Sequence, residues 1–299
     1  MNGDEIMKKA AVIGSISTDF VVTTEVIPNQ GETVVGESFQ TFFGGKGANQ
    51  AIALSRSGID VFMLGAVGED SFGIELLENL KTNAVNTEMI QAVAKSESGS
   101  AHIQINNGDN RIVIIPGANN LISIDVIKQY QKELLTMDLI VLQNEIPMET
   151  VQHIIDFCFE HQIKTIYNPA PAKEIDEEFI EKVTYITPNE HETALLFKGE
   201  SLEKSLRRYP NKLIVTLGEQ GAIFYDGEKE VLIPAHKVAK VVDTTGAGDT
   251  FNGYFAKGIL DGLSLEKSLA LGNAASALAI QAKGAQDGIP VYEKVAETL

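Results

Sequence analysis

The chain has 299 residues, of which 44% are hydrophobic and 22% are charged, a composition typical of a water-soluble globular protein. Its formal net charge of −17 argues against nucleic acid and anionic membranes as partners, because both carry dense negative charge. The single cysteine, Cys158, excludes an internal disulfide and fits a reducing compartment. No signal-peptide pattern or long apolar span is present, so we expect a cytoplasmic protein.

Short apolar runs alternate with segments of helical hydrophobic spacing along most of the chain. The runs predicted as strands lie at 10–13, 61–65, 139–142, 164–167, 185–186 and 212–215. The segments predicted as helices lie at 47–57, 73–81, 148–161 and 190–197. Apolar strands of this kind are buried on both faces, so the pattern predicts an α/β fold. We expect a three-layer sandwich with a central, mostly parallel sheet, formed by a single domain over 1–299.

Two regions depart from this alternation. Polar and apolar residues alternate over 32–43, and 98–116 has the pattern of a hairpin whose turn contains Asn107 and Gly108. Both predict antiparallel strands outside the main sheet. We expect the regions of about 15–43 and 98–116 to form a small antiparallel β lid, the alternative being an ordinary edge hairpin.

A glycine-rich motif at 44–49 leads into the first predicted helix. Its paired glycines allow a ligand to lie against bare backbone. Lys46 can only donate hydrogen bonds, whereas Asn49 can donate and accept, so together they can bind sugar hydroxyls. The alternative is a helix start with a solvated lysine.

A second motif lies near the C-terminus. A β-branched run ends at Asp243, and the small residues Gly246, Ala247 and Gly248 precede Asp249, where helical spacing begins. The free amides and dipole of a helix N-terminus favour an anion such as phosphate. A carboxylate there costs energy unless it has a function, so we interpret Asp249 as a general base for a hydroxyl that attacks a phosphoryl group. The alternative is that Asp249 caps the helix in an ordinary turn.

Two other nucleotide-binding patterns do not fit the chain. There is no G-x-x-x-x-G-K-[ST] sequence, which excludes a P-loop kinase. A dinucleotide fingerprint would require a glycine where Phe251 stands, and no strand ending in an acidic residue follows, so a dinucleotide-binding fold is not expected.

Together, the motifs at 44–49 and 243–249 resemble those of the ribokinase-like (PfkB) carbohydrate kinases. Further similar stretches follow the family order from about residue 10 to 291. They lie at 14–19, 65–70, 168–172, 188–192, 216–218 and 283–286. The first motif is more similar to that of the ribose-phosphorylating members than to those of fructokinases or adenosine kinases. The resemblance implies a β lid that covers the sugar and often joins two subunits.

The resemblance also implies roles for individual residues. Those expected to bind the sugar are Ser17, Asp19, Gly45, Lys46, Asn49, Glu145 and Asp249. Asp249 would be the catalytic base, and the backbone amides of Gly246, Ala247 and Gly248 would stabilise the transferred phosphoryl group. Ser17 departs from the family pattern, which commonly has asparagine there.

On the nucleotide side, the resemblance implies a site for ATP and two cations. The residues expected to bind ATP are Asn189, Thr216, Gly218, Gly221, Gly248 and Asn273. Asn189 and Glu192 would arrange Mg²⁺, although the same spacing is that of a helix capping box. The residues expected around K⁺ are Asp243, Thr245, Ala279, Ala282, Gly284 and Gly288. Gly288 stands where related kinases often have a serine.

The function implied is transfer of the γ-phosphoryl group of ATP to the 5-hydroxyl of D-ribose, by a homodimer that uses Mg²⁺ and K⁺. Ser17 leaves open 2-deoxyribose or another furanose as the substrate. A non-catalytic sugar-binding regulator of the same fold is a third hypothesis, and the presence of Asp249, Asn189 and Glu192 disfavours it.

Overall fold

A parallel sheet lies at the centre of the computed structural model, which describes residues 8–106 and 109–299. Six strands of the described chain form it, and every neighbouring pair is parallel. In spatial order they are β10 (Tyr185–Ile186), β9 (Lys164–Tyr167), β8 (Leu139–Leu142), β1 (Lys9–Ile13), β4 (Asp60–Gly68) and β5 (Asn86–Val93). The predicted central parallel sheet is therefore confirmed, while β5 was not predicted.

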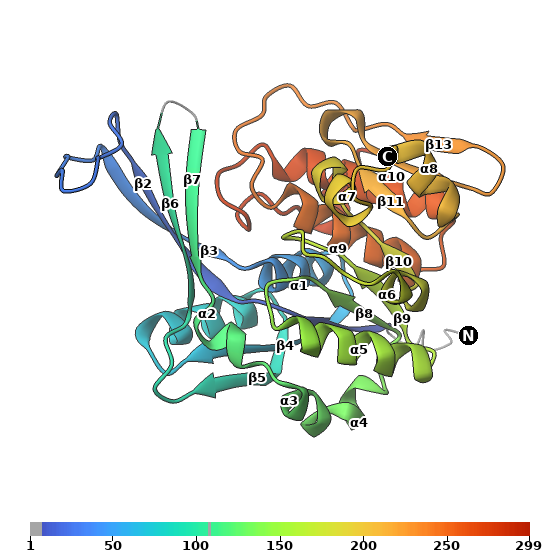
Figure 1. The fold of residues 1–299 in the computed structure, drawn as a ribbon, viewed down its shortest axis with the longest axis horizontal. Helices are drawn as coiled ribbons and strands as arrows, with labels where there is room; N and C mark the ends of the chain where they lie inside the picture. The colour runs from blue at the N-terminus through green and yellow to red at the C-terminus, as the bar shows by residue number, and fades with distance from the viewer. Residues whose placement is uncertain (1–7, 107–108) are drawn as a thin grey trace.

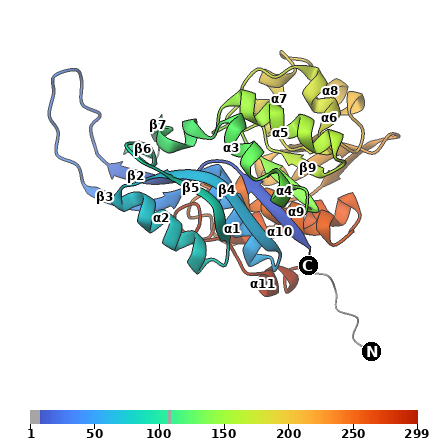
Figure 2. The ribbon, with the colours of Figure 1, turned by 90° about the horizontal axis from the view of Figure 1, so that it is seen from below.

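The sheet has a separate hydrophobic core on each face. Alternate residues of β1 belong to different cores: Ala11 and Ile13 pack in one, and Ala10 and Val12 pack in the other. This alternation is what a strand covered on both faces requires. It accounts for continuous apolar runs in the sequence, and it gives the predicted three-layer arrangement (Figure 2).

Helices cover both faces. On the first core lie α3 (Ile124–Gln129), α4 (Gln131–Leu134), α5 (Met148–Glu160), α6 (Glu177–Lys182), α7 (Glu190–Leu196) and α8 (Leu202–Arg208). On the second lie α1 (Lys46–Arg56), α2 (Ser71–Thr82), α9 (Ala247–Leu260) and α10 (Leu265–Ala279). A short α11 (Tyr292–Ala296) packs against α10. Cys158 of α5 is buried in the first core.

A second sheet consists of β11 (Ile214–Thr216), β12 (Ala222–Tyr225) and β13 (Glu230–Ile233), paired antiparallel. The strand predicted at 212–215 was expected in the central sheet, but in the described chain two isolated parallel bridges, Ile186 to Leu213 and Asn189 to Thr216, link it to β10 and the residues after β10. Its longer pairing is with β12. The turn between them ends at Gly221, whose φ of 107° suits glycine and returns the chain antiparallel.

The predicted lid is a separate sheet of four described strands that projects from the layered body (Figure 1). In order they are β3 (Ser38–Gly44), β2 (Ser17–Thr23), β6 (Gly99–Asn106) and β7 (Asp109–Ile115). The outer pairs are antiparallel as predicted, but β2 and β6 are parallel. They run the same way because each follows a parallel strand of the central sheet. The predicted strand at 32–43 begins only at Ser38, and the predicted turn residues Asn107 and Gly108 lie outside the described residues.

Over the ranges 8–106 and 109–299, none of the helices has both the length and the apolar content that crossing a bilayer would require.

Candidate active site

Asp249 lies in the first turn of α9, close to the predicted glycine turn. Gly246 is the N-cap residue, with a left-handed φ of 76°, and a Cβ atom there would lie 2.6 Å from the carbonyl oxygen of Ala285. Only glycine fits this conformation and this close approach. No side chain caps the helix, so Asp249 is not the N-cap residue of the alternative interpretation. Asp249 is only 6% exposed, and its side chain accepts hydrogen bonds from residues of α1.

Two amides of α1 hold the Asp249 carboxylate. Asn49 Nδ2 donates to Oδ2 at 2.8 Å, and Gln50 Nε2 donates to Oδ1 at 2.9 Å. Helices α1 and α9 meet closely here, because a Cβ atom on Gly253 would lie 2.5 Å from Cβ of Ala53. The close packing therefore brings the two predicted motifs, about 200 positions apart in the sequence, into direct hydrogen-bond contact.

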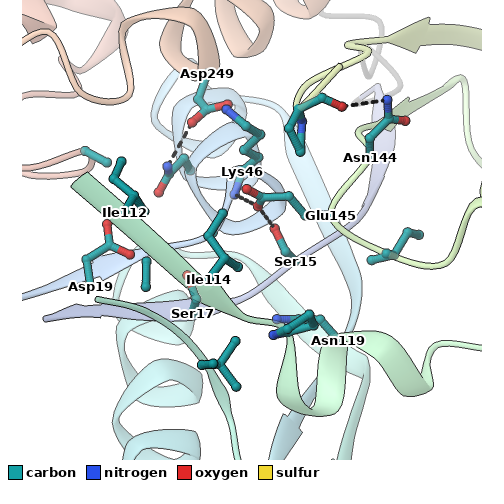
Figure 3. Close-up of a pocket in the computed structure, with 18 of the residues that line it drawn as sticks. Ser15, Ser17, Asp19, Lys46, Ile112, Ile114, Asn119, Asn144, Glu145 and Asp249 are labelled. Atoms are coloured by element: carbon teal, nitrogen blue, oxygen red, sulfur yellow. Dashed lines mark hydrogen bonds between the residues drawn. The ribbon is translucent and has the colours of Figure 1, made fainter. Parts of the chain in front are cut away.

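A cleft with a volume of about 530 Å³ lies between this helix pair and the lid (Figure 3). All seven residues predicted to bind the sugar line it: Ser17, Asp19, Gly45, Lys46, Asn49, Glu145 and Asp249. Ser17 and Asp19 come from β2 of the lid, and the others come from the body. Gly44 gives Asp19 its space, since a Cβ atom at that glycine would lie 2.4 Å from the carboxylate.

Glu145 lies just beyond the carboxyl end of β8, as predicted for a ligand-binding residue of a parallel sheet. Its Oε2 atom accepts hydrogen bonds from the hydroxyl of Ser15 and, at 3.0 Å, from the backbone amide of Lys46. The side chain of Lys46 points towards Asp249, while its main chain lies beside Glu145 (Figure 3). Ser15 was not predicted, although it lies in a stretch that resembles the family.

The cleft concentrates negative charge around one lysine. Asp249 is the main cause of a raised pKa for the Lys46 ammonium, with Glu145, Glu192 and Asp19 adding to it and burial opposing it. Burial, followed by the charges of Glu145 and Asp249, raises the pKa of Asp19 to about 7. Lys46 therefore stays protonated and partly neutralises the carboxylates, whereas Asp19 titrates near neutral pH.

The lid supplies an apolar wall that the sequence did not identify. Ile112 and Ile114 of β7 and Ile103 of β6 line the cleft. The alternation of side chains along β6 and β7 shows in the sequence which residues share a face. It does not show which face is turned towards the cleft. Other lining residues that were not predicted are Asn119, Asn120, Asn144 and Lys173, of which Lys173 donates to the carbonyl oxygen of Asn144 at 2.6 Å.

A second cleft, of about 440 Å³, lies on the other side of the α9 N-terminus. All six residues predicted to bind the nucleotide line it: Asn189, Thr216, Gly218, Gly221, Gly248 and Asn273. The side-chain Nδ2 atom of Asn273 donates to the carbonyl oxygens of Ile233 and Pro234, at 2.9 and 3.1 Å. These bonds hold the end of β13 against α10.

A smaller cavity of about 220 Å³, the joining cavity, shares lining residues with both clefts. Lys46 and Asp249 line both this cavity and the 530 Å³ cleft. Asn189, Thr216 and Gly248 line both this cavity and the 440 Å³ cleft. The three therefore lie side by side around the α9 N-terminus: Asp249 is shared by the larger cleft and the cavity, and Gly248 by the cavity and the second cleft.

Asn189 and Glu192 form the capping box that was the alternative to a magnesium site. The Asn189 side chain accepts from the Glu192 amide at 2.8 Å, and Glu192 Oε2 accepts from the Asn189 amide at 2.9 Å. Both residues also line the joining cavity. Burial is the main cause of a raised pKa for Glu192. Across 8–106 and 109–299, no group of three or more His, Cys, Asp or Glu side chains could hold a metal ion.

The residues predicted around K⁺ come from two adjacent segments. The Asp243 carboxylate accepts from the amides of Thr245 and Gly284, each at 2.9 Å, and so ties the two segments together. A Cβ atom on Gly288 would lie 2.0 Å from the carbonyl oxygen of Ala279. The backbone of Gly288 therefore lies close to the carbonyl group of Ala279. Ala282 lies between them and donates its amide to Ala279.

The family of the chain is evident from a comparison with known proteins. The model of the pfkB family of carbohydrate kinases matches residues 7–291. A ribokinase of Lactococcus lactis is 52% identical over 290 residues, covering 97% of this chain and 96% of the relative. A ribokinase of Bacillus subtilis is 46% identical over 297 residues, covering 98% and 100%. A deoxyribokinase of Salmonella typhi is 37% identical over 300 residues, covering 97% and 98%.

Solved structures have the same fold. A ribokinase from Thermotoga maritima has a TM-score of 0.88 and 32% identity, covering 98% of this chain and 99% of its own. A ribokinase from Arabidopsis thaliana, solved with ribose and ATP, also has a TM-score of 0.88, with 28% identity and the same coverage.

Proposed function

The chain belongs to the pfkB family of carbohydrate kinases, and we propose that it transfers the γ-phosphoryl group of ATP to the 5-hydroxyl of D-ribose. The observation that carries the proposal is the adjacency of the two clefts, which both share lining residues with the cavity at the α9 N-terminus, beside the buried Asp249. One cleft has the polar side chains that a polyol requires, and the other has the exposed glycine backbone that a nucleotide requires.

Ribose would lie in the cleft beneath the lid. The carboxylates of Asp19 and Glu145 would accept hydrogen bonds from its hydroxyls, and Lys46 and Asn49 would donate to them. Ser17 and Gly45 would complete the contact surface. The isoleucines of β6 and β7 would cover the sugar and keep water, the competing phosphoryl acceptor, out of the cleft.

Asp249 would accept the proton of the 5-hydroxyl as that oxygen bonds to the γ-phosphorus. The bond from the γ-phosphorus to the bridging oxygen breaks in the same step, and its electron pair leaves with ADP. Proton transfer comes late in such a loose transition state, so alignment of the reactants carries most of the rate. The amides of Gly246, Ala247 and Gly248, at the positive end of α9, would stabilise the charge on the transferred group.

The residues present fit Mg²⁺ held mainly by phosphate oxygens and water. The ion needs only one or two protein oxygens, and Asn189 and Glu192 line the joining cavity although their capping box occupies part of their hydrogen-bonding capacity. When bound, Mg²⁺ would neutralise charge on the phosphates. The protein itself would contribute the N-terminus of α7, which its capping box holds beside the cavity.

The two segments tied by Asp243 fit K⁺, with oxygens from Asp243, Thr245, Ala279, Ala282, Gly284 and Gly288. A bound cation would strengthen the positive field at the neighbouring anion turn. We expect K⁺ to activate the enzyme more than Na⁺, and equal activity in choline buffer without K⁺ would contradict the site.

We also infer that the protein is a cytoplasmic homodimer joined through the lid. Apolar side chains on the outer face of the lid are exposed, among them Val22, Phe39 and Val113. Such a patch on a projecting sheet is typical of an interaction surface. The buried Cys158 is the sole cysteine and fits a reducing compartment.

2-Deoxyribose is the second candidate substrate, because Ser17 is shorter than the asparagine common in the family and leaves more freedom at the sugar. A coupled assay of ADP release across pentoses and hexoses tests both candidates. D-ribose should give the highest kcat/KM. A higher value for 2-deoxyribose would assign a deoxyribokinase, and the absence of sugar-dependent ADP release would reject a kinase in favour of a sugar-binding regulator.

A further inference from the structure

Each of the two amides that hold Asp249 is itself held by another glutamine. Gln286 Nε2 donates to Asn49 Oδ1 at 2.8 Å, and Gln143 Nε2 donates to Gln50 Oε1 at 2.7 Å. Gln286 is 5% exposed and Gln143 is fully buried, and neither lines the sugar cleft. Two chains of amides therefore converge on the two oxygens of one carboxylate.

The direction of these chains matters because a primary amide has a donor end and an acceptor end of nearly the same shape. Asn49 and Gln50 stabilise the Asp249 carboxylate only when their NH₂ groups face it. With the carbonyl oxygens turned inward, oxygen would face oxygen and the interaction would be repulsive. A donor that occupies each carbonyl oxygen from behind fixes the stabilising orientation.

Gln286 is firmly oriented by its own partners. Its Oε1 atom accepts from Asn79 Nδ2 at 2.7 Å, which leaves its NH₂ group for Asn49. Its backbone carbonyl accepts from Arg56 at 2.9 Å. The second chain of amides ends differently. Among the described residues Oε1 of Gln143 has no hydrogen-bond partner, and it packs directly over Gly14, where a Cβ atom would lie 2.0 Å away.

We propose that Gln286 and Gln143 are positioning residues for phosphoryl transfer, which act through Asn49 and Gln50 to keep both oxygens of Asp249 hydrogen-bonded and aimed at the hydroxyl. The proposal rests on the proposed kinase function. It assigns catalytic importance to two residues that do not touch the sugar, and it connects Asp249 to the 279–288 segment through Gln286.

The test compares Gln286→Leu, Gln286→Glu and the matched control Gln281→Leu. Gln281 is an exposed glutamine five positions earlier whose side chain donates to the carbonyl oxygen of Ala277. Gln286→Leu should lower kcat about five- to tenfold, the value of one hydrogen bond, with the KM for ribose within about twofold of wild type. Gln281→Leu should leave both unchanged.

Gln286→Glu should lower kcat further than Gln286→Leu. The introduced carboxylate keeps the shape and can still accept from Asn79, but it cannot donate to Asn49. It attracts the NH₂ group of Asn49 instead and turns the carbonyl oxygen towards Asp249. A purely structural role predicts the opposite order, because the glutamate is the closer match in volume. Gln143→Met should likewise lower kcat with little change in KM.

A double-mutant cycle with Asn49→Ala separates positioning from general destabilisation. Gln286→Leu should have no further effect on kcat in the Asn49→Ala background. An equal loss in both backgrounds, or wild-type kcat in both Gln286 variants, would overturn the proposal. Hydrogen exchange of the Asn49 side-chain NH₂ group, slow in wild type and faster in Gln286→Leu, reports on the same link without activity. If wild type releases no ADP with any sugar, the proposed function fails. The exchange measurement then tests by itself whether Gln286 orients the side-chain amide of Asn49.

Discussion

The floor of the site, formed by Asn49, Gln50 and Asp249, differs from the lid above it in burial and polarity. In the floor, Asn49, Gln50 and Asp249 are polar and buried, and the hydrogen bonds that satisfy them come from within the chain. In the lid, every residue of β7 is exposed, including Val113 at 61%. The floor residues are hydrogen-bonded within the subunit, whereas the lid leaves apolar side chains exposed.

The difference indicates where precision is needed. In the proposed mechanism, phosphoryl transfer requires the Asp249 carboxylate to be held in place, and its hydrogen bonds from Asn49 and Gln50 would do so. In the same proposal the lid would open for substrate entry, since it projects from the body as a separate sheet. Changes in the floor should therefore alter turnover, while changes in the lid should alter substrate binding, specificity and assembly.

The largest effect is expected in the floor. Asp249→Asn removes the base and one acceptor, so turnover should fall by roughly 10²–10⁴-fold. The protein should stay folded and retain sugar binding, as measured by circular dichroism and calorimetry. Asp261→Asn is the matched control, since Asp261 ends the same helix in an ion pair with Lys257. Near-wild-type turnover of Asp249→Asn would remove the base from the mechanism.

A smaller effect is expected for Asp19→Asn at the base of the lid. An amide replaces a carboxylate that would accept from sugar hydroxyls, so kcat/KM for ribose should fall about 10- to 100-fold, mainly through KM. An unchanged KM would exclude Asp19 from sugar binding.

The same substitution should increase stability at neutral pH. The pKa of Asp19 is raised from 3.8 to about 7, so the folded state keeps a proton that the unfolded state releases at lower pH. The contribution of Asp19 to the free energy of unfolding is therefore full below pH 4 and is lost as pH rises towards 7. Between about pH 4 and pH 7, denaturant unfolding should show that the free energy of unfolding of Asp19→Asn rises relative to that of wild type, by at most about 4 kcal/mol.

The outer face of the lid should control assembly. Val113→Glu places a charge in the exposed apolar patch, so the dissociation constant of the dimer should rise about tenfold or more, with ribose binding weakened several-fold. Val35→Glu is the control, because Val35 is 93% exposed and lies in the loop before β3. Light scattering over a concentration series measures both. A dimer of unchanged affinity in Val113→Glu would place the interface elsewhere.

The smallest effect concerns sugar choice. Ser17→Asn should raise the ratio of kcat/KM for ribose over 2-deoxyribose about fivefold, because a longer amide bonded to the 2-hydroxyl is left without a partner when that hydroxyl is missing. Both sugars are measured in both proteins. An unchanged ratio would show that residue 17 does not contact the 2-hydroxyl.

The sequence predicted most of the central fold, because strand and helix patterns are local. The expected site residues came from resemblance to the family, and those expected to bind sugar and nucleotide line two neighbouring clefts. Strands at 139–142, 164–167 and 185–186 were placed to the residue, because apolar runs between turns specify buried strands. The glycine turn before Asp249 could be identified because only small residues permit it. The spacing of Asn189 and Glu192 predicted both a capping box and a cation site, and the capping box is present.

Tertiary structure decided what depends on contacts between distant segments. The parallel pairing of β2 and β6, the separate sheet of β11 and the inward face of the lid hairpin follow from how whole elements meet, and no local pattern encodes them. The amide chain from Gln286 through Asn49 to Asp249 joins positions up to 237 residues apart. The sequence alone does not show which partners a glutamine side chain has. The packing of α1 against α9 and the 279–288 segment decides that Gln286 donates to Asn49.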